Sequence, residues 1–272
     1  MFSELRDIQW DCICFSETLA ETNDVLLDGG HRLITSLEDF AWAGVGILVH
    51  SRWVGSIRKS VCVSDRIMYV DIELHGYMYR IIAVYLPHGG SKYPRSKFES
   101  CIDSVKQVVL SAESLGYKCM VGGDFNLELY RNWRGQVFQS LVHELNLDIC
   151  NDPTGIDIQE CWSFKSCLGH KRVIDYCCVS TGLRTLVARP INDLLLGSDH
   201  RAVQCQLQLP CHPGRKKWRP QKAAKMDVDW KAYESAITKV QCEARDLQGL
   251  ENSVIRIATR CKRNKPKQEY KP

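Results

Sequence analysis

The feature that most constrains this chain is a set of polar side chains at the ends of strand-like segments. Apolar runs such as those at 10–15 and 119–121 lead into acidic or amide residues. In a layered α/β protein, side chains at strand ends can point into one cleft at the edge of a sheet. Any one of them alone is more often a turn or capping residue, but the repeated pattern predicts a shared site. The residues in these positions are Glu17, Asp124, Asn126, Asp175, Asp199 and His200.

Most apolar segments have the pattern of strands. Residues 67–74 and 78–86 flank the short segment HGY, which predicts a hairpin with a glycine-containing loop. Alternation of apolar and polar residues predicts a half-buried strand over 203–209. Continuous apolar runs predict buried strands at 10–15, 44–49, 119–121 and 173–179.

Two segments show the 3.6-residue period of amphipathic helices. In the first, apolar residues from Phe98 to Ala112 share one face, and Gly116 is expected to end the helix. In the second, the apolar positions lie between 137 and 145. Many strands with few helices predict an α/β fold in which two mixed or antiparallel sheets pack together with helices outside.

Composition divides the chain near residue 210. Residues 1–211 carry a net charge of −5 and residues 212–272 of +9, which together give +4. We predict a body at 1–209, a basic proline-containing linker at 210–227, a helical connector at 228–261 and a disordered basic tail at 262–272. Such an extension often binds nucleic acid, but a solvated linker is the commoner explanation of a charge run.

The chain contains 14 cysteines but no CxxC pair. Six of them lie inside apolar runs, where cysteine behaves as a small hydrophobic residue. The missing pair argues against a structural zinc site. We therefore expect reduced thiols in an intracellular compartment. The cysteines in apolar runs are Cys12, Cys14, Cys119, Cys177, Cys178 and Cys205.

No segment has the pattern of a membrane or secretion signal. No apolar run approaches the roughly 18 residues that a membrane helix needs. The first ten residues, MFSELRDIQW, lack an apolar core of the signal-peptide kind. We therefore expect no contact with a membrane.

The residue types at the strand ends suit a hard divalent cation. Mg²⁺ prefers carboxylate, amide and water oxygens, and acids crowded into a cleft would repel one another without a cation. No Cys–His ligand set accompanies them, which disfavours zinc. A cation beside a histidine suits phosphoester hydrolysis, because it neutralises charge on the phosphate while a carboxylate activates water. Gly122 and Gly123 are expected to permit a tight turn, and since no Lys-Ser/Thr follows them, a P-loop is excluded.

Four short motifs carry a resemblance to a known superfamily. They are SET at 16–18, VYLP at 84–87, GGDFN at 122–126 and SDH at 198–200. Together they resemble the endonuclease/exonuclease/phosphatase superfamily, and most of all the apurinic/apyrimidinic-type endonuclease domain of LINE-type (non-LTR) retrotransposons. The resemblance covers residues 1–209. It implies the DNase-I-like fold, a four-layer sandwich of two mixed β-sheets packed face to face with outer helices.

The resemblance also implies catalytic roles. Tyr85 matches the tyrosine that contacts the scissile phosphate. Asn126 matches the amide that holds this phosphate. Asp124 matches the acid that positions or deprotonates the attacking water. His200 matches the histidine that stabilises the pentacovalent phosphate or acts as base, and Asp175 matches the partner that orients it.

Metal ligands and nucleic-acid contacts are implied in the same way. Glu17 resembles the principal Mg²⁺ ligand and Asp199 a second carboxylate on the metal side, with Asp124 nearby; Mn²⁺ is an alternative ion. For Arg95, as for His88, a solvated loop is the competing interpretation. The candidates for nucleic-acid contacts are Arg95, Ser163 and Arg172.

The chain departs from the superfamily pattern at its start. The superfamily begins with a strand that carries a Trp-Asn-Val run, and no such run precedes Asp11. We expect this first strand to be missing, which would leave neighbouring strands with unpaired backbone groups and remove one residue of the site.

The expected function is Mg²⁺-dependent phosphodiester hydrolysis by a DNA-nicking endonuclease. The resemblance implies a DNA substrate, action in the nucleus and a monomer, and the reverse transcriptase that follows in retrotransposons is absent here. One alternative is a catalytically impaired fragment that binds nucleic acid through its basic extension. Another is a phosphatase of the same superfamily.

Overall fold

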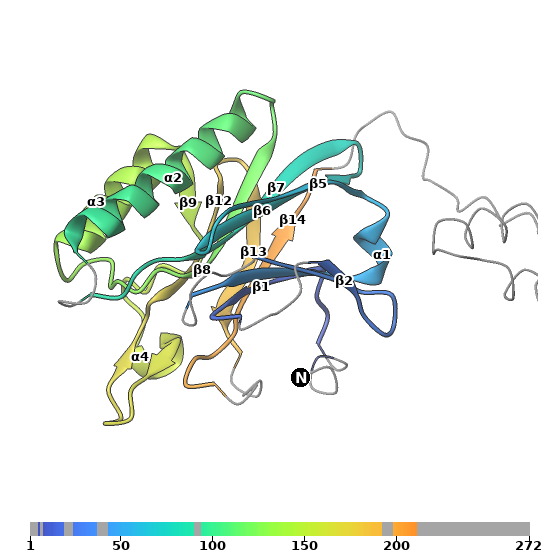
Figure 1. The fold of residues 1–272 in the computed structure, drawn as a ribbon. Coiled ribbons are helices and arrows are strands. Elements are labelled where there is room, and N and C mark those ends of the chain that lie inside the picture. The colour runs from blue at the N-terminus through green and yellow to red at the C-terminus, as the bar shows by residue number, and fades with distance from the viewer. Residues whose placement is uncertain are drawn as a thin grey trace, which may run out of the picture. The chain divides into compact units, whose positions relative to one another are not determined.

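The apolar segments form two β-sheets that pack face to face (Figure 1). The larger has the strand order β5-β6-β7-β8-β12-β9 and is mixed, because β7 and β8 run parallel while its other pairs are antiparallel. Its strands are β5 (Ile57–Ser64), β6 (Ile67–Leu74), β7 (Tyr77–Tyr85), β8 (Lys118–Asp124), β9 (Leu147–Ile149) and β12 (Asp175–Ser180).

The smaller sheet has the order β1-β4-β3-β2, and all of its described pairs are antiparallel. The sequence therefore predicted the sandwich of two sheets. Among the described strands, only the larger sheet is mixed. The smaller sheet consists of β1 (Cys12–Ser16), β2 (Asp24–Leu26), β3 (Arg32–Thr35) and β4 (Val45–Val49).

This computed structural model describes part of the chain. Apart from Pro210, the predicted linker, connector and tail over 210–272 lie outside the described residues. The described residues belong to one compact unit, Met1–His212, and are 5, 8–18, 24–36, 43–89, 94–191 and 198–210.

The predicted hairpin over 67–86 is confirmed, with a shorter turn than expected. Leu74 of β6 pairs with Tyr77 of β7, so the turn consists of His75 and Gly76 alone. Both have positive φ, 52° and 86°. That is the conformation of a type I′ turn, whose twist matches that of the two strands it joins.

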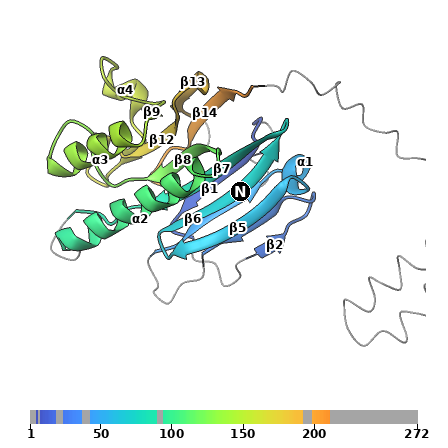
Figure 2. The same ribbon diagram turned by 90° about the horizontal axis from the view of Figure 1, so that it is seen from above.

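Two helices cover the outer face of the larger sheet (Figures 1 and 2). They are α2 (Arg95–Glu113) and α3 (Trp133–Glu144), and both were predicted. The core between them and the sheet contains the predicted face of α2 from Phe98 to Ala112 together with Phe138 and Leu141 of α3. The 3.6-residue period therefore marks this interface correctly.

A second core lies between the two sheets. It includes Val45 and Ile47 of β4 and Met68 and Val70 of β6. The opposite face of the smaller sheet carries Leu48, which packs with Leu5, Ile8 and Trp10.

The remaining elements are short. One antiparallel pair joins β10 (Phe164–Lys165) to β11 (Lys171–Arg172), and another joins β13 (Arg184–Pro190) to β14 (Val203–Gln208), so the strand predicted over 203–209 is confirmed. Within the described residues, β14 pairs only with β13 and β1 only with β4. The short helices are α1 (Ser51–Val54) and α4 (Ile158–Cys161).

Gly122 and Gly123 do not form the expected tight turn, because both lie inside β8. Gly123 faces Val84 of the parallel neighbour β7, and a Cβ atom at Gly123 would lie 1.9 Å from the Val84 carbonyl oxygen. The glycine is therefore needed for the close approach of two strands.

The described helices include none with the length and apolar character needed to cross a membrane. Each cysteine in the described ranges is a free thiol.

Candidate active site

Strand register brings three of the predicted residues to one edge of the larger sheet. Tyr85, the last residue of β7, pairs with Asp124, the last residue of β8. On the other side of β8, Asp175, the first residue of β12, also pairs with Asp124. Three adjacent strands thus present a phenol and two carboxylic acids side by side.

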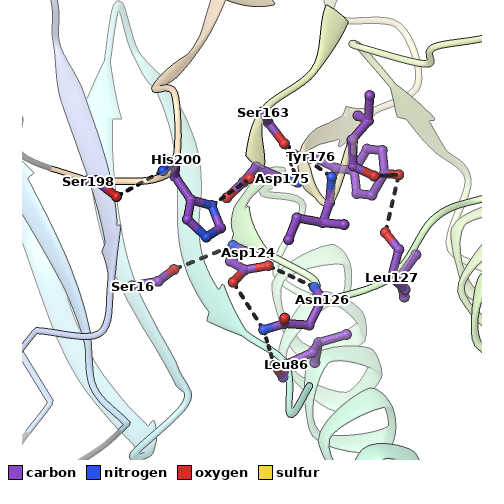
Figure 3. Close-up of polar contacts among 12 residues, drawn as sticks. Ser16, Leu86, Asp124, Asn126, Leu127, Ser163, Asp175, Tyr176, Ser198 and His200 are labelled. Carbon is purple, nitrogen blue, oxygen red and sulfur yellow. Dashed lines mark hydrogen bonds and ion pairs between the residues drawn. The ribbon is translucent and has the colours of Figure 1, made fainter. Parts of the chain in front are cut away.

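Asn126 holds the Asp124 carboxyl group in a fixed orientation. Its backbone N–H donates to Asp124 Oδ1 over 2.8 Å and its side-chain Nδ2 donates to Asp124 Oδ2 over 3.0 Å. The same Nδ2 donates to the Leu86 carbonyl oxygen, also over 3.0 Å (Figure 3). A positive φ of 50° at Asn126 turns its side chain back toward Asp124, a conformation that asparagine tolerates better than most residues.

Asp124 is only 5% exposed. Burial raises the pKa of its carboxyl group to about 8, and the negative charges of Asp175 and Glu17 act in the same direction. The charge of His200 and the hydrogen bond from Asn126 partly oppose the increase. The pKa of Asp124 therefore lies near neutrality, and a bound cation would favour the ionised carboxylate.

His200 and Asp175 form a hydrogen-bonded pair, with 2.9 Å between His200 Nδ1 and Asp175 Oδ2. The other ring nitrogen of His200 is left on the side of Asp124 (Figure 3). The Phe164 ring lies 5.0 Å from the imidazole, and the backbone N–H of His200 donates to the Ser198 hydroxyl. The imidazole is thus fixed from several sides.

The pKa of His200 is set by two opposing effects. Burial alone would lower it, but the hydrogen bond with Asp175 and the charges of Asp175, Asp124 and Asp199 raise it to about 9. In metal-free protein His200 is therefore an imidazolium at neutral pH. A cation in this position suits stabilisation of negative charge better than removal of a proton.

Glu17 and Tyr85 connect the two sheets. The Tyr85 hydroxyl of β7 donates a hydrogen bond to Glu17 Oε1, and Glu17 directly follows β1 of the smaller sheet. Burial, the hydrogen bond to Glu17 and nearby negative charge raise the pKa of Tyr85, so its phenol stays protonated. The Arg66 guanidinium lies 4.7 Å from the centre of the Tyr85 ring.

The groups that gather most closely differ from the predicted metal ligands. Asp124, Asp175 and His200 each bring one ligand atom within 4.8 Å of the other two. Glu17 instead accepts a hydrogen bond from the Tyr85 hydroxyl. Asp199 is exposed, and its backbone carbonyl oxygen accepts a hydrogen bond from the Lys165 N–H. The adjoining carboxylates of Asp124 and Asp175 offer the oxygen ligands that a hard cation such as Mg²⁺ prefers.

The three candidates for nucleic-acid contacts lie in different environments. Ser163 is 0% exposed, and its hydroxyl accepts hydrogen bonds from the backbone N–H groups of Ile174 and Asp175, both over 3.1 Å. Full burial does not suit contact with nucleic acid, so Ser163 instead holds the start of β12. Arg95 is exposed, forms an ion pair with Glu99 at 2.8 Å and stacks on Trp133.

Arg172 is exposed on β11, next to the candidate site. It faces Phe164 of β10 across the strand pair, and Phe164 contacts the His200 ring. Arg172 also lines a surface hollow made entirely of basic residues. The others are Arg131, His170 and Lys171.

Sequence reasoning missed several supporting residues. The Ser16 hydroxyl accepts from the Asp124 N–H over 3.4 Å, and Asn151 Nδ2 donates to the Asp175 carbonyl oxygen over 2.9 Å. Ser16 lies next to Glu17 in the SET motif, so its position was a usable signal. Asn151 follows a three-residue strand that no pattern predicted, and nothing in the sequence linked it to Asp175.

A scan for sequence families and a search of curated proteins find no match to this chain. Solved structures do match. They show that the chain has the fold of the endonuclease/exonuclease/phosphatase proteins, among which are nucleases and phosphatases.

Three solved structures illustrate the likeness. The AP endonuclease of Leishmania major matches with a TM-score of 0.61 and 15% identity over 76% of this chain and 81% of that one. The endonuclease domain of TRAS1, a telomere-specific non-LTR retrotransposon, gives 0.54 and 15% over 76% and 90%. The 3′ phosphatase NExo (D146N) from Neisseria, bound to product DNA hairpin, gives 0.58 and 16% over 76% and 93%. At such identities the likeness shows the fold.

Proposed function

We propose that this chain is a divalent-metal-dependent phosphodiester hydrolase that nicks DNA, with an origin in a LINE-type retrotransposon. One observation carries the proposal. The Asp124–Asn126 pair and the Asp175–His200 pair meet beside Tyr85 at the end of three adjacent strands. An oriented carboxylate, an amide and a histidine cation at one point are the groups that hydrolysis of a phosphodiester requires.

We assign His200 to the phosphate. Its protonated ring can stabilise the negative charge that develops on the pentacovalent phosphate, and its raised pKa supports this role over that of a base. Asp175 is a positioning residue, since it accepts from Nδ1 and leaves the other nitrogen for the substrate.

We assign Asp124 to the attacking water. Asn126 orients both carboxylate oxygens, and a carboxylate whose pKa lies near neutrality accepts a proton more readily than an ordinary one. The Asn126 amide and the protonated Tyr85 hydroxyl are suited to donate hydrogen bonds to phosphate oxygens. Tyr85 and Asp124 lie side by side at the ends of β7 and β8, which suits these roles.

Glu17 and Asp124, with Asp199 at the rim, are the residues that would hold Mg²⁺ or Mn²⁺. The ion would supply positive charge that neutralises the phosphate in the transition state. To bind it, the Glu17 carboxylate would share its oxygens between the ion and the Tyr85 hydroxyl, to which it is already hydrogen bonded.

The proposed substrate is DNA. The basic hollow of Arg131, His170, Lys171 and Arg172 supports this choice, because clustered cations bind the phosphate backbone. The DNA hairpin bound to the Neisseria phosphatase lends further support. We propose that the protein acts as a monomer inside the cell. When its target is chromosomal DNA, we propose that it acts in the nucleus.

Nicking of supercoiled plasmid with Mg²⁺ tests the proposal. We expect wild-type protein to produce open circles, and Asp124→Asn and His200→Ala to lower the rate at least about a hundredfold. Asp148→Asn is the matched control, because Asp148 is an exposed acid on β9 that pairs with Val179 of β12, four residues beyond Asp175. Folded wild-type protein that leaves plasmid intact, or releases only terminal phosphate from DNA, would contradict endonuclease activity.

A further inference from the structure

Three thiols from distant parts of the chain meet near the candidate active site, with Cys177 two residues after Asp175 on the same strand. Cys150 follows β9, Cys177 lies in β12 and Cys205 lies in β14. Their sulfur atoms are all within 4.8 Å of one another, and each residue is partly buried. We refer to these three residues as the thiol cluster.

Hydrogen bonds fix the backbone around the thiol cluster. The Cys150 N–H donates to the Cys177 carbonyl oxygen over 2.8 Å, and the Cys177 N–H donates to Asn151 Oδ1 over 2.9 Å. The Thr185 hydroxyl donates to Cys150 Sγ over 3.3 Å. The sulfur atoms are therefore held together by the fold.

We propose that the thiol cluster is a binding site for a soft cation with a filled d shell, Cu⁺ or Zn²⁺. Metal–sulfur bonds of about 2.3 Å in a tetrahedral site place thiolates about 3.8 Å apart. Separations up to 4.8 Å allow that geometry after small rotations of the side chains. Thiolates select such cations, whereas the carboxylates of the candidate active site select hard ones.

The number of ligands narrows the choice of ion. In the described part of the chain, no histidine, acid or further cysteine joins the three sulfur atoms. Three thiolates complete a trigonal site for Cu⁺, while Zn²⁺ would take water as its fourth ligand.

A bound ion would join two parts of the fold that lack strand pairing. The β13–β14 pair forms its own sheet. In the described part of the chain, β14 packs against β12 of the larger sheet without strand pairing between them. Cys205 lies near the start of β14, shortly after His200, while Cys177 is two residues after Asp175. An ion between Cys205 and Cys177 would therefore keep His200 against Asp175.

The chain contains no CxxC pair, so ligand spacing along the sequence disfavours zinc. A CxxC pair places two ligands in one turn, whereas each residue of the thiol cluster comes from a different element. Only the packing of strands brings the three cysteines together, so no local sequence motif predicts the thiol cluster.

Metal titration of the reduced full-length chain tests the proposal. With Cd²⁺ as a spectroscopic probe in phosphine reductant, we expect one equivalent to produce a thiolate charge-transfer band. Cys150→Ser and Cys205→Ser should each lose the band, while Cys167→Ser, an exposed cysteine in the β10–β11 loop, should keep it. A band that both cluster variants retain, or no band in wild-type protein, would overturn the proposal.

A second measurement needs no variant. Alkylation mapped by mass spectrometry should show that Cd²⁺ protects Cys150, Cys177 and Cys205, and a disulfide among them in protein handled without oxygen would overturn the proposal. Loading with equal amounts of Cu⁺ and Zn²⁺, followed by desalting and elemental analysis, identifies the ion. Retention of neither ion would also overturn it. These readouts are independent of DNA cleavage.

Discussion

Ser163 shows how single residues shape the candidate site without touching a substrate. Its buried hydroxyl accepts from the N–H groups of Ile174 and Asp175, so it determines where β12 begins. This role could not be predicted, because a serine before a strand carries no signal of which backbone groups it will meet.

Ser163→Ala should destabilise the protein by about 1–3 kcal/mol, since it leaves two buried donors without an acceptor. Urea unfolding measures the change, with Ser100→Ala on the exposed side of α2 as control. A loss no greater than that of the control would contradict the proposed role of the hydroxyl.

The His200–Asp175 pair gives a pH dependence with a defined sign. The pKa of His200 rises from its ordinary value of 6.5 to about 9 in the folded protein. The pair therefore stabilises the fold fully below about pH 6.5, and this contribution is lost as the pH rises through 9. NMR titration of the imidazole in EDTA should show the raised pKa, and Asp175→Asn should lower it. A wild-type pKa at or below 6.5 would contradict the account.

At the scale of elements, the β7–β8 pair depends on one glycine. A side chain at Gly123 would collide with the Val84 carbonyl of the neighbouring strand, and its φ of 145° is unfavourable for other residues. Gly123→Ala should cost on the order of 3 kcal/mol and displace Asp124 at the end of β8.

Gly55→Ala is the matched control for that change, because open space surrounds Gly55 and its φ of −68° suits alanine. Thermal unfolding compares the two variants. Equal melting temperatures would show that the close approach of β7 and β8 is not required.

A buried ion pair joins the β6–β7 hairpin to helix α2. Arg80 donates to both carboxylate oxygens of Asp71, over 2.7 and 2.9 Å, and also to the Val108 carbonyl oxygen of α2. Asp71→Asn should cost about 3–5 kcal/mol, because it leaves a buried guanidinium without its counter-charge.

Glu73→Gln is the control, since Glu73 lies on β6 like Asp71, but its ion pair with Arg58 of β5 is substantially exposed. We expect that change to cost no more than about 1 kcal/mol. Chemical denaturation that ranks the two variants in the opposite order would contradict the importance of the buried pair.

The elements differ in how well the sequence predicts them. Helix α2 and the β6–β7 hairpin bury regular apolar patterns, and both were located correctly. The strands β5 and β13 were missed, because they carry many polar side chains and have few buried positions. Their pairing comes from long-range contacts, which local patterns do not contain.

At the scale of the whole molecule, the motifs predicted that Asp124, Asp175 and His200 share a site and that Asp175 orients His200. Strand register pairs Asp124 with Asp175, and the chain that leads into β14 brings His200 to them. The hydrogen bond from Tyr85 to Glu17 depends on how separate sheets pack against each other, and so does the thiol cluster. Such contacts appear only when the complete sandwich is assembled.

The central claim is that a divalent cation and this sheet edge together hydrolyse DNA. The most direct measurement is plasmid nicking by one wild-type preparation in Mg²⁺, after addition of EDTA, and after Mg²⁺ is restored in excess. We expect open circles with Mg²⁺, loss of at least about a hundredfold in rate with EDTA, and full recovery. Nicking that persists in EDTA, or that Asp124→Asn protein performs equally well, would contradict the account.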